Sequence, residues 1–203
     1  MKSINEILAI GRNTIVTEAR ALAVVESRLD ERFVLAVETI SSCRGRLIIT
    51  GMGKSGHVGR KIAATLTSTG TRAIFLHAAE ALHGDLGVIA PEDVVLAISY
   101  SGETEEIVRV ADYVKTNGVK LVAMTGDVNS SLAERASIVL DTHVDEQGGI
   151  LDFVPTASTT VQMAMGDAIA AALMHINDFD IKDFARMHPG GYLEKRINDS
   201  HKE

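Results

Sequence analysis

The amino-terminal part of the chain repeats its apolar residues at helical spacing. Intervals of mostly three and four positions put these side chains on one face of an α-helix. We expect one long helix over residues 4–28 and a second over residues 31–43, which together predict an N-terminal helical hairpin. The apolar positions are Ile4, Leu8, Ile15, Ala19, Leu22 and Val25, followed by Phe33, Val34, Val37 and Ile40.

Beyond residue 44 the apolar residues gather in short, nearly continuous runs. Stretches long enough for helices separate these runs, among them residues 56–69 and 104–117. Apolar strands that alternate with helices are typical of a parallel sheet covered on both faces. The pattern predicts an α/β fold, a doubly wound parallel sheet of about five strands flanked by helices. The expected strands are residues 46–50, 72–76, 93–98, 119–124 and 137–141.

The carboxyl-terminal part returns to helical patterns. A helix rich in alanine and methionine is expected over residues 156–175, and a shorter one over residues 179–187. A chain of 203 residues is large enough for one well-buried domain. We therefore expect a single domain over 1–203, made of N-terminal helices in 1–44, an α/β core in 45–176 and a C-terminal helical segment in 177–203.

Composition and charge narrow the function classes. The formal net charge of −7 argues against a general nucleic-acid binder and against a protein that binds anionic membrane surfaces. No apolar run reaches the roughly 18 residues of a membrane-spanning helix, and the first residues lack the apolar block of a signal peptide. Cys43 is the only cysteine, so no internal disulfide can form. A cytoplasmic protein is the simplest expectation.

The segment GMGKSG, residues 51–56, has the spacing G-x-G-x-x-G between a strand and a helix. A dinucleotide site would need an acidic residue after the second strand, where His77 stands, and a P-loop would need a glycine in place of Ile48. The glycines by themselves would only permit a tight turn. Lys54 and Ser55 add a cation and a hydroxyl at a helix entrance, where the helix dipole favours an anion. We expect an anion site without a dinucleotide.

Two further loops combine hydroxyl side chains with a helix entrance. In SYSGETEE, Ser99, Ser101 and Thr104 surround a glycine just before an expected helix. Together with the free amides of that helix, these hydroxyls would surround a phosphate with neutral donors. An ordinary helix cap followed by acidic first-turn residues would explain the same sequence without a ligand. The third loop is PTASTT, residues 155–160. Three such loops at one edge of a parallel sheet favour a ligand site there.

The chain contains five motifs in a fixed order: GMGKSGHVGRKIAAT, ALHGDLG, SYSGETEE, PTASTTVQMAMGDAIA and HPGG. They resemble the sugar isomerase (SIS) domain of phosphosugar isomerases, in particular of bacterial D-arabinose 5-phosphate isomerases. The resemblance implies a flavodoxin-like strand order, interconversion of ribulose 5-phosphate and arabinose 5-phosphate, no organic cofactor, and a homo-oligomer such as a dimer or tetramer. Members often carry two CBS domains after the SIS domain. Since this chain ends at KRINDSHKE, we expect those domains to be absent or cut away.

The resemblance also implies roles for individual side chains. Lys54 matches an active-site lysine of the family, Glu106 an acidic candidate base, and His83 and His188 two family histidines. In related enzymes a histidine enters the site from a neighbouring subunit. The hydroxyls expected to hold or lie near the substrate phosphate are those of Ser55, Ser99, Ser101, Thr104, Ser158 and Thr159.

One segment departs from the family pattern. Family members place a second glutamate in the loop after the fifth strand, before a stretch like CPLGLAPT, whereas this chain has DEQGGILDFVPT. Counting back from Pro155, the position of that glutamate falls on Gln147, next to Glu146. A glutamine cannot accept a proton as a carboxylate does. Either Glu146 takes its place, or Glu106 serves alone, or the substrate differs.

Aldose–ketose isomerisation moves a proton between C1 and C2 through a cis-enediol(ate). It needs a base (Glu106), a shuttle for the hydroxyl protons (His188 or His83) and a donor that faces the developing oxyanion (Lys54). Structural explanations compete, because Glu106 also suits a helix start, His83 could bond Asp85 in a loop, and His188 precedes a helix-breaking Pro-Gly-Gly. We expect no metal site, since the histidines lack a ligand spacing such as H-E-x-x-H.

Three functions stay open. The first is a phosphosugar isomerase that acts on arabinose 5-phosphate, the second a non-catalytic SIS module that binds a sugar phosphate and reports it to a partner, and the third an isomerase of another ketose phosphate. We also expect self-association, because the early helices and the methionine-rich late helix offer more apolar surface than one sheet domain covers.

Overall fold

The computed structural model describes residues 2–189, which contain one five-stranded parallel sheet in the order β2-β1-β3-β4-β5. The order is the flavodoxin-like one, so the predicted α/β class is confirmed. In the register, Gly51 at the end of β1 pairs with His77 of β2 and with Ile98 of β3, which brings the loops after these strands to one edge. The strands are β1 (Leu47–Gly51), β2 (Ala73–His77), β3 (Val94–Ile98), β4 (Lys120–Thr125) and β5 (Ile138–Asp141).

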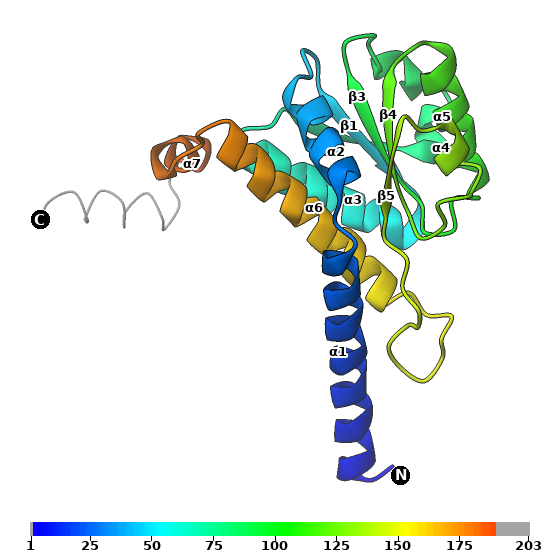
Figure 1. Cartoon of the computed structure of the whole chain (residues 1–203). Coiled ribbons are helices and arrows are strands. Elements are labelled where there is room, and N and C mark those ends of the chain that lie inside the picture. The colour runs from blue at the N-terminus through cyan, green and yellow to red at the C-terminus, as the bar shows by residue number, and fades with distance from the viewer. Residues whose placement is uncertain (1, 190–203) are drawn as a thin grey trace, which may run out of the picture.

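Helices cover both faces of the sheet (Figure 1). Because successive strand residues point to opposite faces, Leu47 and Ile49 belong to one apolar core and Ile48 to the other. The first core joins the sheet to α2, α3, α6 and the end of α1, and the second joins it to α4 and α5. The helices are α1 (Ile4–Ser27), α2 (Glu31–Ser41), α3 (Gly53–Ser68), α4 (Ala78–Ala81), α5 (Glu105–Thr116), α6 (Ala157–Ile176) and α7 (Ile181–Met187).

The first two helices form where the sequence predicts them, but they do not fold back on each other as a hairpin. In Figure 1 they follow one another in the same general direction, and the amino-terminal half of α1 projects away from the sheet. Both helices pack on α6, and the apolar face of α2 enters the core beside the sheet. The predicted hairpin is therefore wrong. The apolar face of α2 is buried on α6 and the sheet, whereas α1 joins the core only near its carboxyl end and leaves most of its apolar residues exposed.

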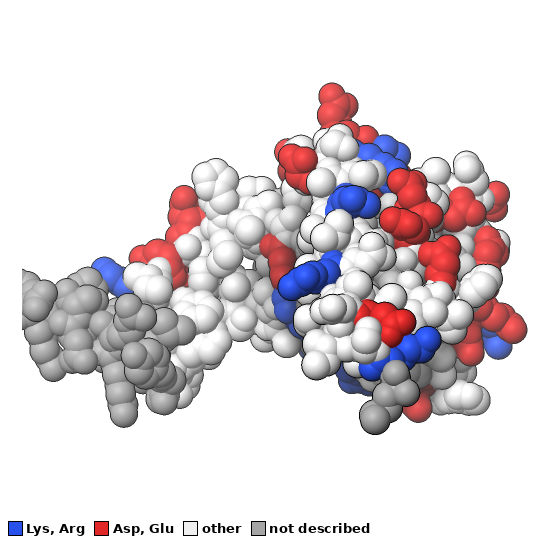
Figure 2. All heavy atoms as spheres, turned by 90° about the horizontal axis from the view of Figure 1, so that it is seen from below, with Lys and Arg blue, Asp and Glu red and all other residues white. Residues whose placement is uncertain are grey.

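Most of α1 is left uncovered in the single chain. Ile4, Ile7 and Ile15 are 77%, 63% and 69% exposed. Within residues 2–189 no helix is both long enough and apolar enough to cross a membrane. Figure 2 views the molecule from below, and on this face acidic and basic side chains are interspersed among uncharged ones. The amino-terminal half of α1 thus leaves apolar side chains exposed at the surface of the single chain.

Candidate functional site

A cavity of about 320 Å³ lies where α3, α5 and α6 begin, at the carboxyl edge of the sheet. No side-chain cap binds the first amides of α3 or α5. Free amides and helix dipoles that converge on a cavity favour an anion. Lys54 is the one charged side chain among the described residues that line it. The lining residues are Met52, Lys54, Ser55, Ile98, Ser99, Tyr100, Ser101, Thr104, Pro155, Ser158, Thr159 and Gln162.

The glycine-rich turn brings α3 against the end of β1. Gly53 has a φ of 53° where α3 begins, a conformation that glycine adopts without strain. A Cβ on Gly56 would lie 2.9 Å from the carbonyl oxygen of Gly51. The glycines therefore have the structural role of closing a tight turn. That turn also sets Lys54, which is exposed, and Ser55 at the cavity.

The loop after β3 contributes three hydroxyls. Ser99 is buried, and its Oγ lies 3.1 Å from Oγ1 of Thr104, the residue before α5. One of these two hydroxyls donates to the other, so one hydrogen is left for a ligand. The Ser101 Oγ accepts a 3.2 Å hydrogen bond from the N–H of Glu103. Its hydroxyl hydrogen is not used in that bond.

A hydrogen bond and a close backbone approach fix this loop against the one after β4. The carboxylate of Glu103 accepts a 2.7 Å hydrogen bond from the N–H of Ser131. That bond, aided by nearby Arg135, holds the pKa of Glu103 below its ordinary value. Gly102 has a φ of 68°, and a Cβ there would overlap the side chain of Ser130. The chain can make this close approach only with glycine at position 102.

The entrance of α6 is capped by Gln147. Its Oε1 accepts from the N–H of Thr156 at 2.9 Å and from the N–H and hydroxyl of Ser158 at 3.1 and 3.2 Å. The Thr159 hydroxyl donates to the carbonyl of Thr156 at 2.9 Å. The hydroxyl hydrogens of Ser158 and Thr159 are thus directed to protein acceptors. From the sequence alone, Gln147 is only a residue that cannot act as a base. The structure shows that it caps the start of α6.

Two lining residues that make side-chain hydrogen bonds, Tyr100 and Gln162, were not predicted. Gln162 is fully buried on α6, and its Oε1 accepts a 3.2 Å hydrogen bond from the hydroxyl of Ser55. The Tyr100 hydroxyl donates to the carbonyl of Val144 and accepts from its N–H, both at 3.2 Å, which ties the loop after β5 to the loop after β3. A signal for Gln162 exists, because it is a polar residue four positions after Ser158 and therefore lies on the same face of the helix.

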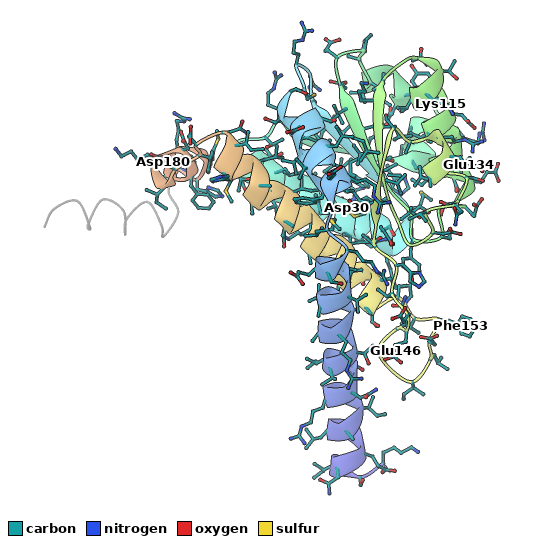
Figure 3. All side chains as sticks on the ribbon, in the orientation of Figure 1. Asp30, Lys115, Glu134, Glu146, Phe153 and Asp180 are labelled. Carbon is teal, nitrogen blue, oxygen red and sulfur yellow. The ribbon has the colours of Figure 1, made fainter. Side chains whose placement is uncertain are left out.

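The other predicted residues do not line this cavity. Glu106 is half-buried in the first turn of α5, and His83 is exposed just after α4, where no hydrogen bond joins it to Asp85. Glu146 is exposed in the loop between β5 and α6 (Figure 3). It borders a separate cavity of about 510 Å³ against α1. Within residues 2–189, no three His, Cys, Asp or Glu side chains cluster as metal ligands would.

Residues 39–172 match the family model described as the SIS domain. The chain belongs to the SIS domain family. Arabinose 5-phosphate isomerase KdsD of Pseudomonas aeruginosa is 47% identical over 186 residues, which cover 92% of this chain and 57% of that protein. Arabinose 5-phosphate isomerase GutQ of Salmonella typhimurium is 46% identical over 191 residues, covering 94% of this chain and 60% of the relative.

The solved structures agree with this membership. An Escherichia coli CFT073 protein in complex with arabinose 5-phosphate superposes with a TM-score of 0.89 at 36% identity, covering 93% of this chain and 100% of that one. This SIS domain spans less than two thirds of the length of the curated relatives it matches.

His188 lies apart from the cavity within this SIS domain. It follows α7, with its Nδ1 2.9 Å from the carbonyl oxygen of Phe184 and its ring stacked on that of Phe184 at 4.0 Å. The 20 residues of α6 rise about 30 Å from the cavity end of the helix to its far end. In Figure 1, α7 lies beyond that far end, away from the sheet. The chain therefore does not bring His188 to its own cavity.

Proposed function

We propose that this SIS domain is a phosphosugar aldose–ketose isomerase that interconverts D-arabinose 5-phosphate and D-ribulose 5-phosphate. The cavity at the entrances of α3, α5 and α6 carries the proposal, because hydroxyls, free amides and one lysine suit a phosphate monoester. Two relatives named arabinose 5-phosphate isomerase support the choice of sugar, as does the related structure in complex with arabinose 5-phosphate.

The phosphate is held chiefly by the loop after β3. Ser101 and the Ser99–Thr104 pair each have a hydroxyl hydrogen to offer, and the uncapped amides at the start of α5 lie beside them. Ser55, Ser158 and Thr159 complete the rim. Neutral donors suit this task because a dianion accepts hydrogen bonds at every oxygen.

The reacting carbons lie beside the phosphate. Lys54 polarises the carbonyl oxygen and stabilises the enediolate. Glu106, two residues after Thr104, is the base that moves the proton between C1 and C2, and exposed Glu146 is the next candidate. A positioned base contributes about 10²- to 10⁴-fold to turnover. The reaction transfers protons within one substrate, so it requires no organic cofactor, and we place the protein in the cytoplasm.

A histidine from a second copy completes the site. His188 lies beyond the far end of α6, so it can serve only the cavity of a neighbouring subunit, and His83 is the alternative proton shuttle within the chain. The exposed apolar residues of α1 supply surface for a homo-oligomer. Sedimentation at micromolar concentration should show a dimer or larger species, and a lone monomer would contradict a shared site.

Isotope exchange tests the proposed reaction. The protein is incubated with ribulose 5-phosphate in deuterated water, and we expect arabinose 5-phosphate with deuterium at C2. Binding without deuterium incorporation would instead indicate a non-catalytic SIS module that senses a sugar phosphate. Deuterium incorporation only with hexulose phosphates would indicate that the substrate is another ketose phosphate.

A further inference from the structure

The buried carboxamide of Gln162 is only half satisfied. Its Oε1 accepts a hydrogen bond from Ser55, but its Nε2 is buried and meets no acceptor among residues 2–189. The residue is fully buried at the cavity, on the face of α6 that packs against α3. An unpaired buried N–H lowers stability. A residue needed only for packing would be apolar, as its buried neighbours Val161 and Met165 are.

The direction of the Ser55 hydroxyl conflicts with anion binding. A serine hydroxyl has one hydrogen to donate, and in the structure Ser55 directs it to Gln162. The Ser55 oxygen then presents only lone pairs to the cavity. Phosphate oxygens of a dianion also present only lone pairs, so the two repel. Ser55 can bind a phosphate only if its hydrogen turns away from Gln162.

We propose that Gln162 is a positioning residue that turns the Ser55 hydroxyl toward the substrate phosphate. This inference rests on the proposed function, which places a phosphate in the cavity. A half-turn of the carboxamide exchanges Oε1 and Nε2, which have nearly the same size. Nε2 then donates to the Ser55 oxygen, and the Ser55 hydroxyl donates to a phosphate oxygen.

The half-turn also redistributes the unmet hydrogen bonds. After the rotation the Nε2–H of Gln162 has an acceptor, and its Oε1 is the atom left without a hydrogen-bond partner. Folded proteins tolerate a buried unpaired carbonyl oxygen better than a buried unpaired N–H. The hydrogen bonds from Gln162 to Ser55 and from Ser55 to the phosphate then form a chain. In a buried site each bond of such a chain is strengthened when the last acceptor is a dianion. Bound phosphate therefore selects the rotated amide.

The test combines Gln162→Met, which keeps the length of the side chain but removes both polar atoms, with Ser55→Ala. Calorimetric titration with arabinose 5-phosphate should show affinity about threefold to tenfold lower for each single variant. The double variant should bind no more weakly than Ser55→Ala alone, because Gln162 acts through that hydroxyl. The melting temperature of unliganded Gln162→Met should equal or exceed that of the parent protein. Met163→Leu, one position along α6 and outside this cavity, is the control and should leave affinity unchanged.

Each other outcome overturns the inference. Unchanged affinity in Gln162→Met means that the amide does not act on the phosphate. Additive losses in the double variant remove the route through Ser55, and a lower melting temperature indicates a structural role. If Ser101→Ala and Ser55→Ala weaken binding while Gln162→Met does not, the proposed function stands and only this inference fails. If the parent protein binds no arabinose 5-phosphate, both fail together.

Discussion

The side-chain carbonyl oxygen of Gln147 accepts hydrogen bonds from both the backbone N–H and the hydroxyl of Ser158, at 3.1 and 3.2 Å. It also accepts from the N–H of Thr156. One residue therefore fixes the entrance of α6 and takes up the hydroxyl hydrogen of Ser158. Counting back from Pro155 places the second glutamate expected from the family pattern at this position, where the structure has a helix cap.

Loss of this cap should lower stability. Gln147→Ala removes the acceptor of three hydrogen bonds, and a lost helix cap costs about 0.5–2 kcal/mol. We expect a fall of about 2–4 °C in melting temperature per kcal/mol lost. Gln147→Glu, which keeps an acceptor and adds a charge that the helix dipole favours, should retain the parent stability at neutral pH. Equal melting temperatures for Gln147→Ala and the parent would contradict the capping role.

Acid should weaken the contact between the loops after β3 and β4. The pKa of Glu103 is held below its ordinary value of 4.5, mainly by the hydrogen bond from the N–H of Ser131. The carboxyl group of Glu103 therefore binds its proton more tightly in the unfolded chain than in the folded one. The contact stabilises the fold fully above the ordinary pKa, and this stabilisation is lost as the pH falls through the lower pKa of the folded state. Urea titrations should give the parent a higher midpoint than Glu103→Gln at pH 7, and the difference should shrink as the pH falls below the ordinary pKa of 4.5. A constant difference across that range would rule out this linkage.

The Tyr100 hydroxyl should matter for the loop after β5. Tyr100→Phe removes both hydrogen bonds to Val144 and leaves its buried N–H without an acceptor, a loss of about 1–3 kcal/mol. Hydrogen exchange should speed up at the amide of Val144. Tyr113→Phe, a tyrosine on the opposite side of the sheet in α5, is the matched control and should leave that amide unchanged. Equal protection of Val144 in Tyr100→Phe and the parent would show that the ring alone holds the loop.

Substrate binding and turnover should depend on two different residues near the start of α5. Ser101→Ala removes a hydroxyl that has a hydrogen to offer, so we expect mainly weaker binding, by about threefold to tenfold. Glu106→Gln should bind substrate nearly as the parent does and lose about 10²- to 10⁴-fold in kcat. Steady-state kinetics and titration calorimetry distinguish the two. Unchanged kcat in Glu106→Gln would move the base to another carboxylate, with Glu146 next.

The sequence predicts the sheet well because the inner strands β1, β3 and β4 are almost wholly buried and read as mainly apolar runs. Each strand begins one residue later than predicted, as Leu47 does in place of residue 46. The hairpin prediction fails because periodicity shows that α1 has an apolar face but not what covers it, and Ile4 and Ile15 remain exposed.

The site is predictable in part for a similar reason. Parallel strands carry their following loops to one edge, so the hydroxyl loops could be placed together from the order of elements alone. Gln162 bonds Ser55 across 107 residues, and Tyr100 bonds Val144 across 44. Such pairings depend on how α6 lies against α3 and on how the loops pack, which local patterns do not encode.

A crystal structure with D-arabinose 5-phosphate tests the central claim most directly. We predict the phosphate in the cavity between α3, α5 and α6, with its oxygens about 2.5–3.0 Å from the hydroxyl of Ser101 and from the one hydroxyl of the Ser99–Thr104 pair that is left to donate. A phosphate bound elsewhere on the protein, or hydroxyls in this cavity that point away from it, would contradict the assignment.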